Sequence, residues 1–338
     1  MSVESKTQAP KSGVEIRAVA PEEDGVRLDR WFRRQFPGLT QGRVEKLLRT
    51  GQIRVDGGRA KAAQRLQAGQ QVRVPPLDGA ARAPAAPRRG DRPVSARDAA
   101  DLQALLLHRD RHVLVLNKPA GLAVQGGSKT DRHLDGMLDA LKFDAKERPR
   151  LVHRLDRDTS GVLVLARSAA AAARLAEAFR ERSARKTYWA IVAGAPELRE
   201  GEIRLALAKR PGGRGERMQA DETGGKRAVT RYSVIDRAKR EAAWLALQPL
   251  TGRTHQLRVH CAEIGTPILG DSKYGRRDDF SARKEIGRGL HLHAHAIDIA
   301  HPAGGRLVQQ APPPEHMRRT MRFLGFEPSD YEDPFVDI

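Results

Sequence analysis

The sequence has few of the features that mark membrane, secreted or zinc-binding proteins. Its 338 residues include one cysteine, Cys261, which excludes an internal disulfide and a multi-cysteine zinc site. No apolar run approaches the roughly 18 residues that a membrane-spanning helix needs. The first residues also lack the apolar core of a signal peptide. We therefore expect a protein of the reducing cytoplasm with no membrane partner.

Acidic residues are scarce relative to basic ones. The chain has 61 Lys and Arg against 42 Asp and Glu, a formal net charge of +19. Unbalanced positive charge repels itself, so the excess favours a polyanionic partner, nucleic acid before an anionic membrane. The length allows two or three domains.

The N-terminal part predicts a small basic module behind a flexible arm. Residues 1–25 are polar and contain Pro and Gly, and we expect a disordered arm there. Residues 26–76 show helical spacing of apolar residues twice, followed by two short strands. Between Arg27 and Arg73 the sequence has 12 basic and 3 acidic residues, a net of +9.

Basic side chains recur at every third position of the second predicted helix. Arg43, Lys46 and Arg49 share a face opposite the apolar one, and Arg54 follows in the next strand. Such a face is often only solvated, but the uncompensated charge favours an RNA or DNA backbone. The run R-x-x-x-L-L-R-x-G-x-I-x-V-x-G resembles the small RNA-binding domain of ribosomal protein S4. This resemblance implies that the module binds RNA.

A second, larger domain is predicted after a linker. Residues 77–100 are rich in Ala, Arg and Pro without periodicity, which is typical of a linker. In residues 101–326 strands follow one another mostly without a helical crossover. The fold class is therefore α+β, with a mixed, largely antiparallel sheet flanked by helices. We expect a mobile Gly-rich basic loop at 209–226 and a C-terminal tail at 327–338.

The motif with the most concentrated chemistry is Leu151–Gly161, which reads LVHRLDRDTSG. The apolar run Val162–Ala166 follows directly, so this loop feeds a buried strand. Unpaired charge is costly at the edge of a core. A surface turn whose Asp and Ser bond the backbone is the plain alternative. Further polar motifs stand at Asn117–Gly121, Arg185–Tyr188, Gly252–His260 and Gly270–Gly275.

Together and in this order, the motifs resemble those of the RluA-type family of RNA pseudouridine synthases. The resemblance implies that Asp156, within His-Arg-Leu-Asp, is catalytic and that Arg258 pairs with it. Tyr188 would stack on the base and take the C5 proton. The longer enzymes of the family, including its RluC-like branch, act on large-subunit ribosomal RNA, which is the partner that the resemblance implies.

The chemistry of such an isomerisation agrees with these residues. The enzyme must break the C1'–N1 bond of a uridine, turn the base and rejoin it through C5. One carboxylate, Asp156, can act as nucleophile or base, or stabilise positive charge on the sugar. Arg154 is placed to fill the space that a flipped base leaves. We expect no metal or organic cofactor, no protein partner and a monomer. Other substrate contacts are expected from four residues: His153, Lys186, Arg253 and Lys118.

Some of these residues also allow other interpretations. His291, His293 and His295 alternate along a predicted strand and could bind a metal with His260, but packing at the core edge is preferred. Asp156 and Asp158 could form a glycosidase pair, although loop neighbours give no assurance of the required separation. A non-catalytic RNA-binding protein and a nucleic-acid glycosylase stay open.

Overall fold

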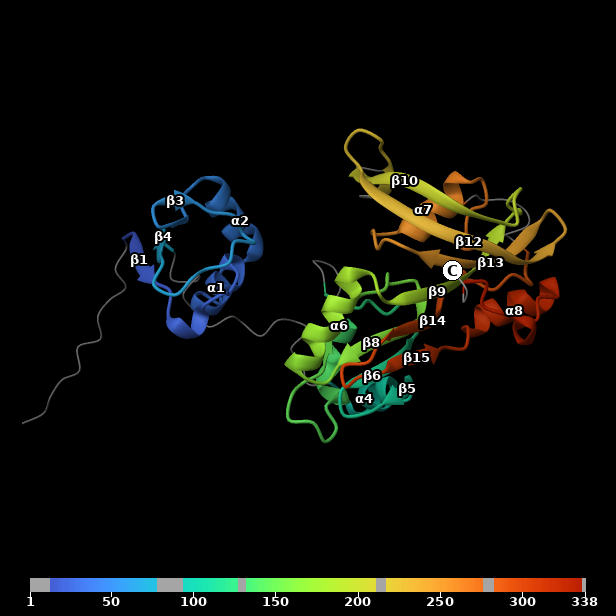
Figure 1. Ribbon diagram of the computed structural model, residues 1–338, viewed down its shortest axis with the longest axis horizontal. Helices are drawn as coiled ribbons and strands as arrows, with labels where there is room; N and C mark the ends of the chain where they lie inside the picture. The colour runs from blue at the N-terminus through green and yellow to red at the C-terminus, as the bar shows by residue number, and fades with distance from the viewer. Residues whose placement is uncertain (1–12, 78–93, 127–131, 211–216, 276–282, 336–338) are drawn as a thin grey trace, which may run out of the picture. The chain divides into compact units, whose positions relative to one another are not determined.

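The chain forms two compact units, Met1–Arg92 and Pro93–Ile338, in a computed structural model (Figure 1). The structure describes residues 13–77, 94–126, 132–210, 217–275 and 283–335. Parts of four predicted segments lie outside the described residues: 1–12 of the arm, 78–93 of the linker, 211–216 of the Gly-rich loop and 336–338 of the tail.

The first unit packs two helices on a small sheet. Its strands lie in the order β1-β4-β2-β3. Trp31, Phe32 and Phe36 are fully buried in its core, as their helical spacing predicts. The elements are β1 Glu15–Ala18, η1 Pro21–Glu23, α1 Leu28–Gln35, α2 Gln41–Arg49, β2 Arg54–Val55, β3 Gly58–Arg59 and β4 Gln71–Val74.

The N-terminal arm is shorter than the sequence predicts. Residues Glu15–Ala18 pair antiparallel with β4, so the prediction of disorder is wrong from Glu15 onward. This strand is held by backbone hydrogen bonds to β4, which the side chains do not reveal. A strand with one exposed face also needs few apolar residues, so its composition resembles that of a disordered segment.

The second unit is built on one large sheet. The strands of its main path follow the order β11-β10-β12-β13-β9-β14-β8-β6-β5, while β15 pairs with β14 and β7 with β8. Of the described pairs, β14–β8 is parallel and the others are antiparallel, which confirms the predicted mixed sheet. The strands are β5 Leu106–Arg109, β6 Val113–Lys118, β7 Arg150–Leu151, β8 Ser160–Ala166, β9 Arg185–Ala193, β10 Glu200–Arg210, β11 Arg217–Ala220, β12 Lys226–Ala238, β13 Ala242–Pro249, β14 Leu292–Ala300 and β15 Arg306–Gln310.

Helices cover both faces of this sheet (Figure 1). In β8, Val162 and Val164 pack with α6, whereas Leu163 and Leu165 pack with α4, α5 and η2 on the other face. This alternation explains why Val162–Ala166 is apolar throughout, since both faces of β8 are buried. The helices are α4 Ala96–Gln103, α5 Leu134–Met137, η2 Leu138–Leu141, α6 Ala169–Glu181, α7 Gln256–Glu263, α8 Glu315–Leu324 and η3 Pro328–Asp330.

Three segments predicted as irregular carry structure. Ser95 caps α4 by accepting a hydrogen bond from the Asp98 backbone N–H, so a helix begins inside the predicted linker. In the predicted loop 209–226, β11 pairs with the end of β10. In the predicted tail, Tyr331 packs against Trp189 and Trp244, and Phe335 is buried. Burial of these two aromatic rings fixes a segment whose composition is otherwise polar.

The polar loop Leu151–Gly161 ends at a close backbone contact. Gly161 has φ +112°, and a Cβ atom there would lie 2.2 Å from the carbonyl oxygen of Ala294 in β14. A side chain would therefore clash with backbone, and only glycine fits. This contact holds the end of the loop against the neighbouring strand.

Candidate active site

One cavity of about 450 Å³ gathers the predicted catalytic residues. Its walls come from the loop 153–159, the end of α6, the start of β9 and residues 249–258. The volume lies within the usual range for small-molecule sites. The cavity brings together Asp156, Tyr188, Arg258, Arg154, His153, Lys186 and Arg253, which are all the predicted catalytic and substrate-binding residues except Lys118.

Lys118 is a structural clamp, and the prediction that it binds substrate is wrong. Its side chain is fully buried, and Nζ donates hydrogen bonds to the carbonyls of Pro119, Leu122 and Arg157 at 2.8–3.0 Å. A buried ammonium needs three acceptors, and the loop backbone supplies them. Burial lowers the pKa of Lys118 to about 8, although Asp158 and Asp156 oppose this shift.

His153 anchors the loop through a neutral imidazole. Its Nε2 accepts the Val164 backbone N–H at 2.8 Å, and its ring stacks on Phe179 with centroids 4.6 Å apart. Burial lowers the pKa of His153 to about 3, with a further contribution from Lys186. The ring lines the cavity, but its hydrogen bond to β8 makes it a support of the loop rather than a charged substrate ligand.

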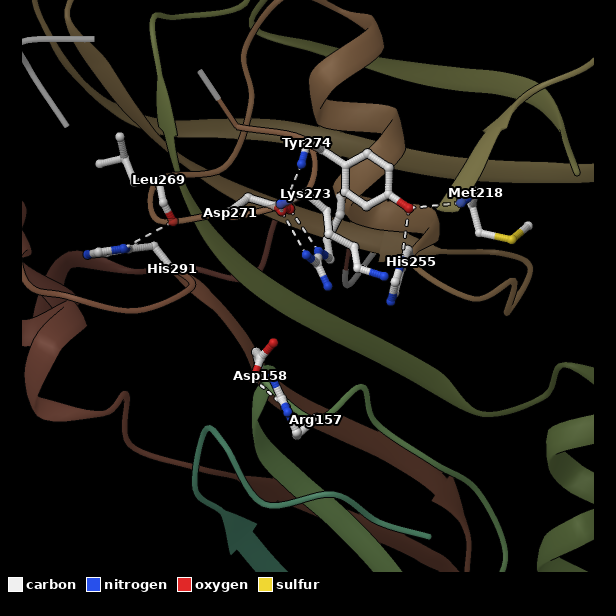
Figure 2. A network of polar contacts seen from close by, with 10 residues as sticks. Arg157, Asp158, Met218, His255, Leu269, Asp271, Lys273, Tyr274 and His291 are labelled. Carbon is white, nitrogen blue, oxygen red and sulfur yellow. Dashed lines mark hydrogen bonds and ion pairs between the residues drawn. The ribbon is translucent and has the colours of Figure 1, made fainter. Parts of the chain in front are cut away.

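Arg258 is held by Asp271, which corrects the predicted pairing with Asp156. The Arg258 Nε and Nη2 atoms each donate to an Asp271 carboxylate oxygen at 2.7 Å (Figure 2). Both side chains are buried, and the bidentate geometry is the strong form of this pair. Burial alone would raise the pKa of Asp271, but Arg258 and the backbone N–H groups of Lys273 and Tyr274 lower it.

Asp156 itself is half-buried and lines the same cavity as Arg258. Its side chain makes no hydrogen bond or ion pair to the residues that the structure describes. Burial lowers the pKa of Arg258, whereas the contacts with Asp271 and then the charge of Asp156 raise it. Asp156 and Arg258 therefore still interact across the cavity. The carboxylate is thus available to a substrate instead of being consumed by a salt bridge.

Tyr188 remains a neutral phenol at neutral pH. Burial, and then the charge of Asp156, raise the pKa of its hydroxyl. A phenolate base is disfavoured by this environment. Tyr188 can therefore accept a proton from a substrate only as it passes its own hydroxyl proton to another base.

Several cationic side chains line the cavity. Arg154 and Arg180 are exposed, and Lys186 and Arg253 are partly buried. Arg253 is steadied by a hydrogen bond from Nε to the Arg227 carbonyl at 3.2 Å. Several cations around one cavity suit a polyanion better than a small neutral ligand.

The start of α7 is fixed by a buried amide. Gln256 accepts hydrogen bonds from the Thr251 hydroxyl and the Arg253 N–H, and donates to Val229 O and Thr230 Oγ1. These four bonds satisfy the side chain completely. The helix is preceded by His255, which is in a left-handed conformation with φ 54° and makes no side-chain hydrogen bond to the first turn.

The two histidines of β14, and His291 directly before it, pack within the core. His291 contacts the Thr320 hydroxyl, His293 lies between Ser160 Oγ and the Ala311 carbonyl, and His295 stacks on Trp189. Within the ranges that the structure describes, no group of three or more His, Cys, Asp or Glu side chains could hold a metal ion. These contacts agree with the predicted packing at the core edge.

Sequence reasoning missed Asp271 and Tyr274 as parts of this site. Asp271 binds Arg258, and the Tyr274 hydroxyl contacts His255 Nδ1 at 2.9 Å. The only available signal was the polar turn Gly270–Gly275, which carries an acid and an aromatic residue close together. Nothing in its spacing shows that it folds back onto α7.

The neutral state of His153 predicts loss of stability in acid. Its pKa is lowered from 6.5 to about 3 in the folded protein, so below pH 6.5 the unfolded chain binds a proton that the folded chain does not. The free energy of unfolding should therefore fall as the pH falls, by up to about 1.4 kcal/mol per unit from this residue. His153→Gln keeps an acceptor for Val164 without titrating. The free energy of unfolding, measured by urea unfolding at several pH values between 5.5 and 4.5, should depend less steeply on pH in the variant than in the wild type. An equal pH dependence of the two proteins would contradict the prediction.

Comparisons with known proteins agree with this geometry. Residues 112–263 match the family model described as RNA pseudouridylate synthase, and residues 26–72 match the S4 domain. Within the described residues, no helix has the length and apolar character needed to cross a membrane.

Two curated relatives and one solved structure illustrate the similarity. The chain is 38% identical to ribosomal large subunit pseudouridine synthase C of Escherichia coli (strain K12), over 94% of this chain and 98% of that protein. It is 35% identical to the Haemophilus influenzae protein of the same name, over 88% and 91%. The structure of human RNA pseudouridylate synthase domain containing 4 has 30% identity and a TM-score of 0.59, covering 70% of this chain and 97% of that one. The chain belongs to the RNA pseudouridylate synthase family.

Proposed function

We propose that this protein converts specific uridines to pseudouridine in large-subunit ribosomal RNA, as a monomer in the cytoplasm. The observation that carries the proposal is the convergence of Asp156, Tyr188 and Arg258 in one cavity. They come from a loop, β9 and α7, segments far apart in the chain. The relatives named ribosomal large subunit pseudouridine synthase C support the choice of RNA.

The reaction rearranges bonds around one sugar carbon. The C1'–N1 bond breaks, the base turns, a C1'–C5 bond forms, C5 loses a proton and N1 gains one. Asp156 acts either as nucleophile at C1' or as the base that starts an elimination. Arg258, fixed by Asp271, supplies a positive field beside that carboxylate. Tyr188 stacks on the base and takes the C5 proton, passing its own hydroxyl proton to a base in the cavity.

The direct experiment is to map pseudouridine in ribosomal RNA from cells with and without the gene. Loss of pseudouridine at defined sites in the deletion strain, restored by the wild-type gene, is the expected result. A glycosylase would release free uracil, and a non-catalytic RNA-binding protein would leave the modification pattern unchanged. Either outcome would contradict the proposal.

Asp156→Asn should abolish activity while preserving the fold. The amide has the size of the carboxylate but is neither an anionic nucleophile nor a base at neutral pH. Single-turnover conversion should fall to background, with unchanged melting and RNA affinity. Asp158→Asn is the matched control in the same loop: Asp158 lies outside the cavity lining and pairs with Arg157 at 3.0 Å. Near wild-type conversion by Asp156→Asn would remove Asp156 from the mechanism.

Arg154 is proposed to fill the place of the flipped base. It is exposed at the cavity wall and lies two residues before Asp156. Arg154→Ala should slow conversion of a uridine in a duplex stem more than of the same uridine in an unpaired strand, because unstacking costs a few kcal/mol only in the stem. Conversion rates on the two RNAs measure this. Equal losses on both would make Arg154 a general electrostatic contact.

The basic face of the first unit is proposed to bind the RNA backbone. Arg43, Lys46 and Arg49 are exposed on α2, and their apolar neighbours Val44, Leu47 and Leu48 are buried. The fourth predicted residue, Arg54, is exposed but donates to the Gly51 and Gly57 carbonyls, which limits its reach.

Replacing Lys46 and Arg49 together by Ala should weaken binding to long RNA and flatten its salt dependence. Two lost phosphate contacts should reduce the slope of log affinity against log salt by roughly 1.4 to 1.8. The control removes Arg318 and Arg322, which pair with Glu315 on α8, so that the change in net charge is equal. Equal effects of the two double variants would show a non-specific charge effect.

A further inference from the structure

His255 enters the active-site cavity from an unusual backbone conformation. It precedes α7 with φ 54°, in the left-handed region that residues other than glycine rarely adopt. Its half-buried side chain lines the cavity with Asp156 and Arg258. Strain of this kind persists where the surroundings fix it, and it is frequent at functional sites.

The Tyr274 hydroxyl orients the imidazole ring. This oxygen accepts the Met218 backbone N–H at 3.0 Å and lies 2.9 Å from His255 Nδ1 (Figure 2). The guanidinium groups of Arg217 and Arg258 lie 5.0 and 5.3 Å from the centroid of the Tyr274 ring, and these groups cannot accept a hydrogen bond.

The contacts of Tyr274 fix the tautomer of His255. Among the described residues, Nδ1 is the acceptor within reach of the phenolic hydrogen. A buried hydroxyl requires one, so Tyr274 donates to Nδ1 and the ring hydrogen lies on Nε2. Burial lowers the pKa of His255, against the opposing charge of Asp156, and so favours this neutral ring.

The Nε2–H group is a donor that has no partner among the described residues. Figure 2 shows the free edge of the ring turned away from Tyr274. A target nucleotide offers phosphate oxygens and the two uracil carbonyls as acceptors. The cations at the cavity wall, such as Arg154 and Lys186, match phosphate, whereas a neutral N–H beside Asp156 matches a neutral carbonyl.

We propose that His255 binds a carbonyl oxygen, O2 or O4, of the uracil base through its Nε2–H, and that Tyr274 is the positioning residue that sets this tautomer. The proposal rests on the proposed function and extends it to recognition of the base. Because Met218 belongs to β11, the hydrogen bond from its N–H also ties the position of this donor to the β10–β11 hairpin.

The test crosses protein variants with substrate atoms. The substrate is a synthetic RNA hairpin with the mapped target as uridine, 2-thiouridine or 4-thiouridine, since sulfur is a weak acceptor. His255→Ala should reduce affinity and single-turnover rate on uridine by about 10-fold, the effect of one hydrogen bond. On one of the two thio analogues His255→Ala and the wild type should differ by only about 1-fold, because sulfur has already removed the acceptor. The position of sulfur in that analogue identifies the oxygen that His255 binds. His255→Gln should recover part of the loss.

Controls separate this role from packing and from phosphate binding. His112→Gln, outside the cavity lining, should change neither affinity nor rate. Tyr274→Phe should lose a few-fold on uridine and little on the identifying analogue. The proposal would be overturned if His255→Ala lost equally on all three RNAs or lost nothing on uridine. It would also be overturned if the variant reduced the slope of log affinity against log salt by about 1, which would show a phosphate contact instead. Should His255→Ala not fold, His255→Gln and Tyr274→Phe provide the same comparison. If the effect of His255→Ala on affinity depended on the thio substitution but the wild type converted none of the RNAs, the proposed function would be refuted and the contact with the base would stand.

Discussion

The ammonium group of Lys118 is fully buried, and the position of the catalytic loop depends on the backbone carbonyls that bind it. Three backbone carbonyls surround Nζ, and one of them belongs to Arg157, directly after Asp156. The Gly121 N–H reaches the same carbonyl at 2.9 Å. A buried charge of this kind is costly to leave unpaired, so any displacement of the loop exposes it to that cost. The catalytic carboxylate is thereby placed by backbone contacts, and its own oxygens stay available.

The same division of labour recurs at Arg258. Asp271 binds the guanidinium group of Arg258 and is itself held by two backbone N–H groups, while Gln256 fixes the first turn of α7. The residues proposed to do the chemistry are therefore held in place by the hydrogen bonds of other residues. Such support is what holds a catalytic geometry within the tolerance that a reaction needs.

The sequence was sufficient for the long strands of the large sheet and for seven residues that line the cavity, but not for the pairing of charges. The uninterrupted apolar run Val162–Ala166 predicts a strand buried on both faces, which β8 is. Arg258, in contrast, has two acids within reach in space, and only the fold of the 270–275 turn decides that Asp271 is its partner. Lys118 resembled a surface lysine because its three acceptors are backbone atoms, which no side-chain pattern reveals. The strand β1 was missed for the same reason, since its stability comes from pairing with β4.

The single described parallel ladder of the large sheet has a mechanical consequence. The strands β8 and β14 meet through two residue pairs, His293 with Ser160 and Ala294 with Gly161. Asp156 leads into β8, whereas Tyr188 lies on β9, the partner of β14 on its other edge. The strands that carry Asp156 and Tyr188 to the cavity are therefore linked through β14, and on the side of β8 that link is a ladder of two residue pairs. A displacement of β8 along β14 would change the separation of the carboxylate and the phenol, and it is opposed both by this ladder and by the apolar side chains that the two strands bury together against α6.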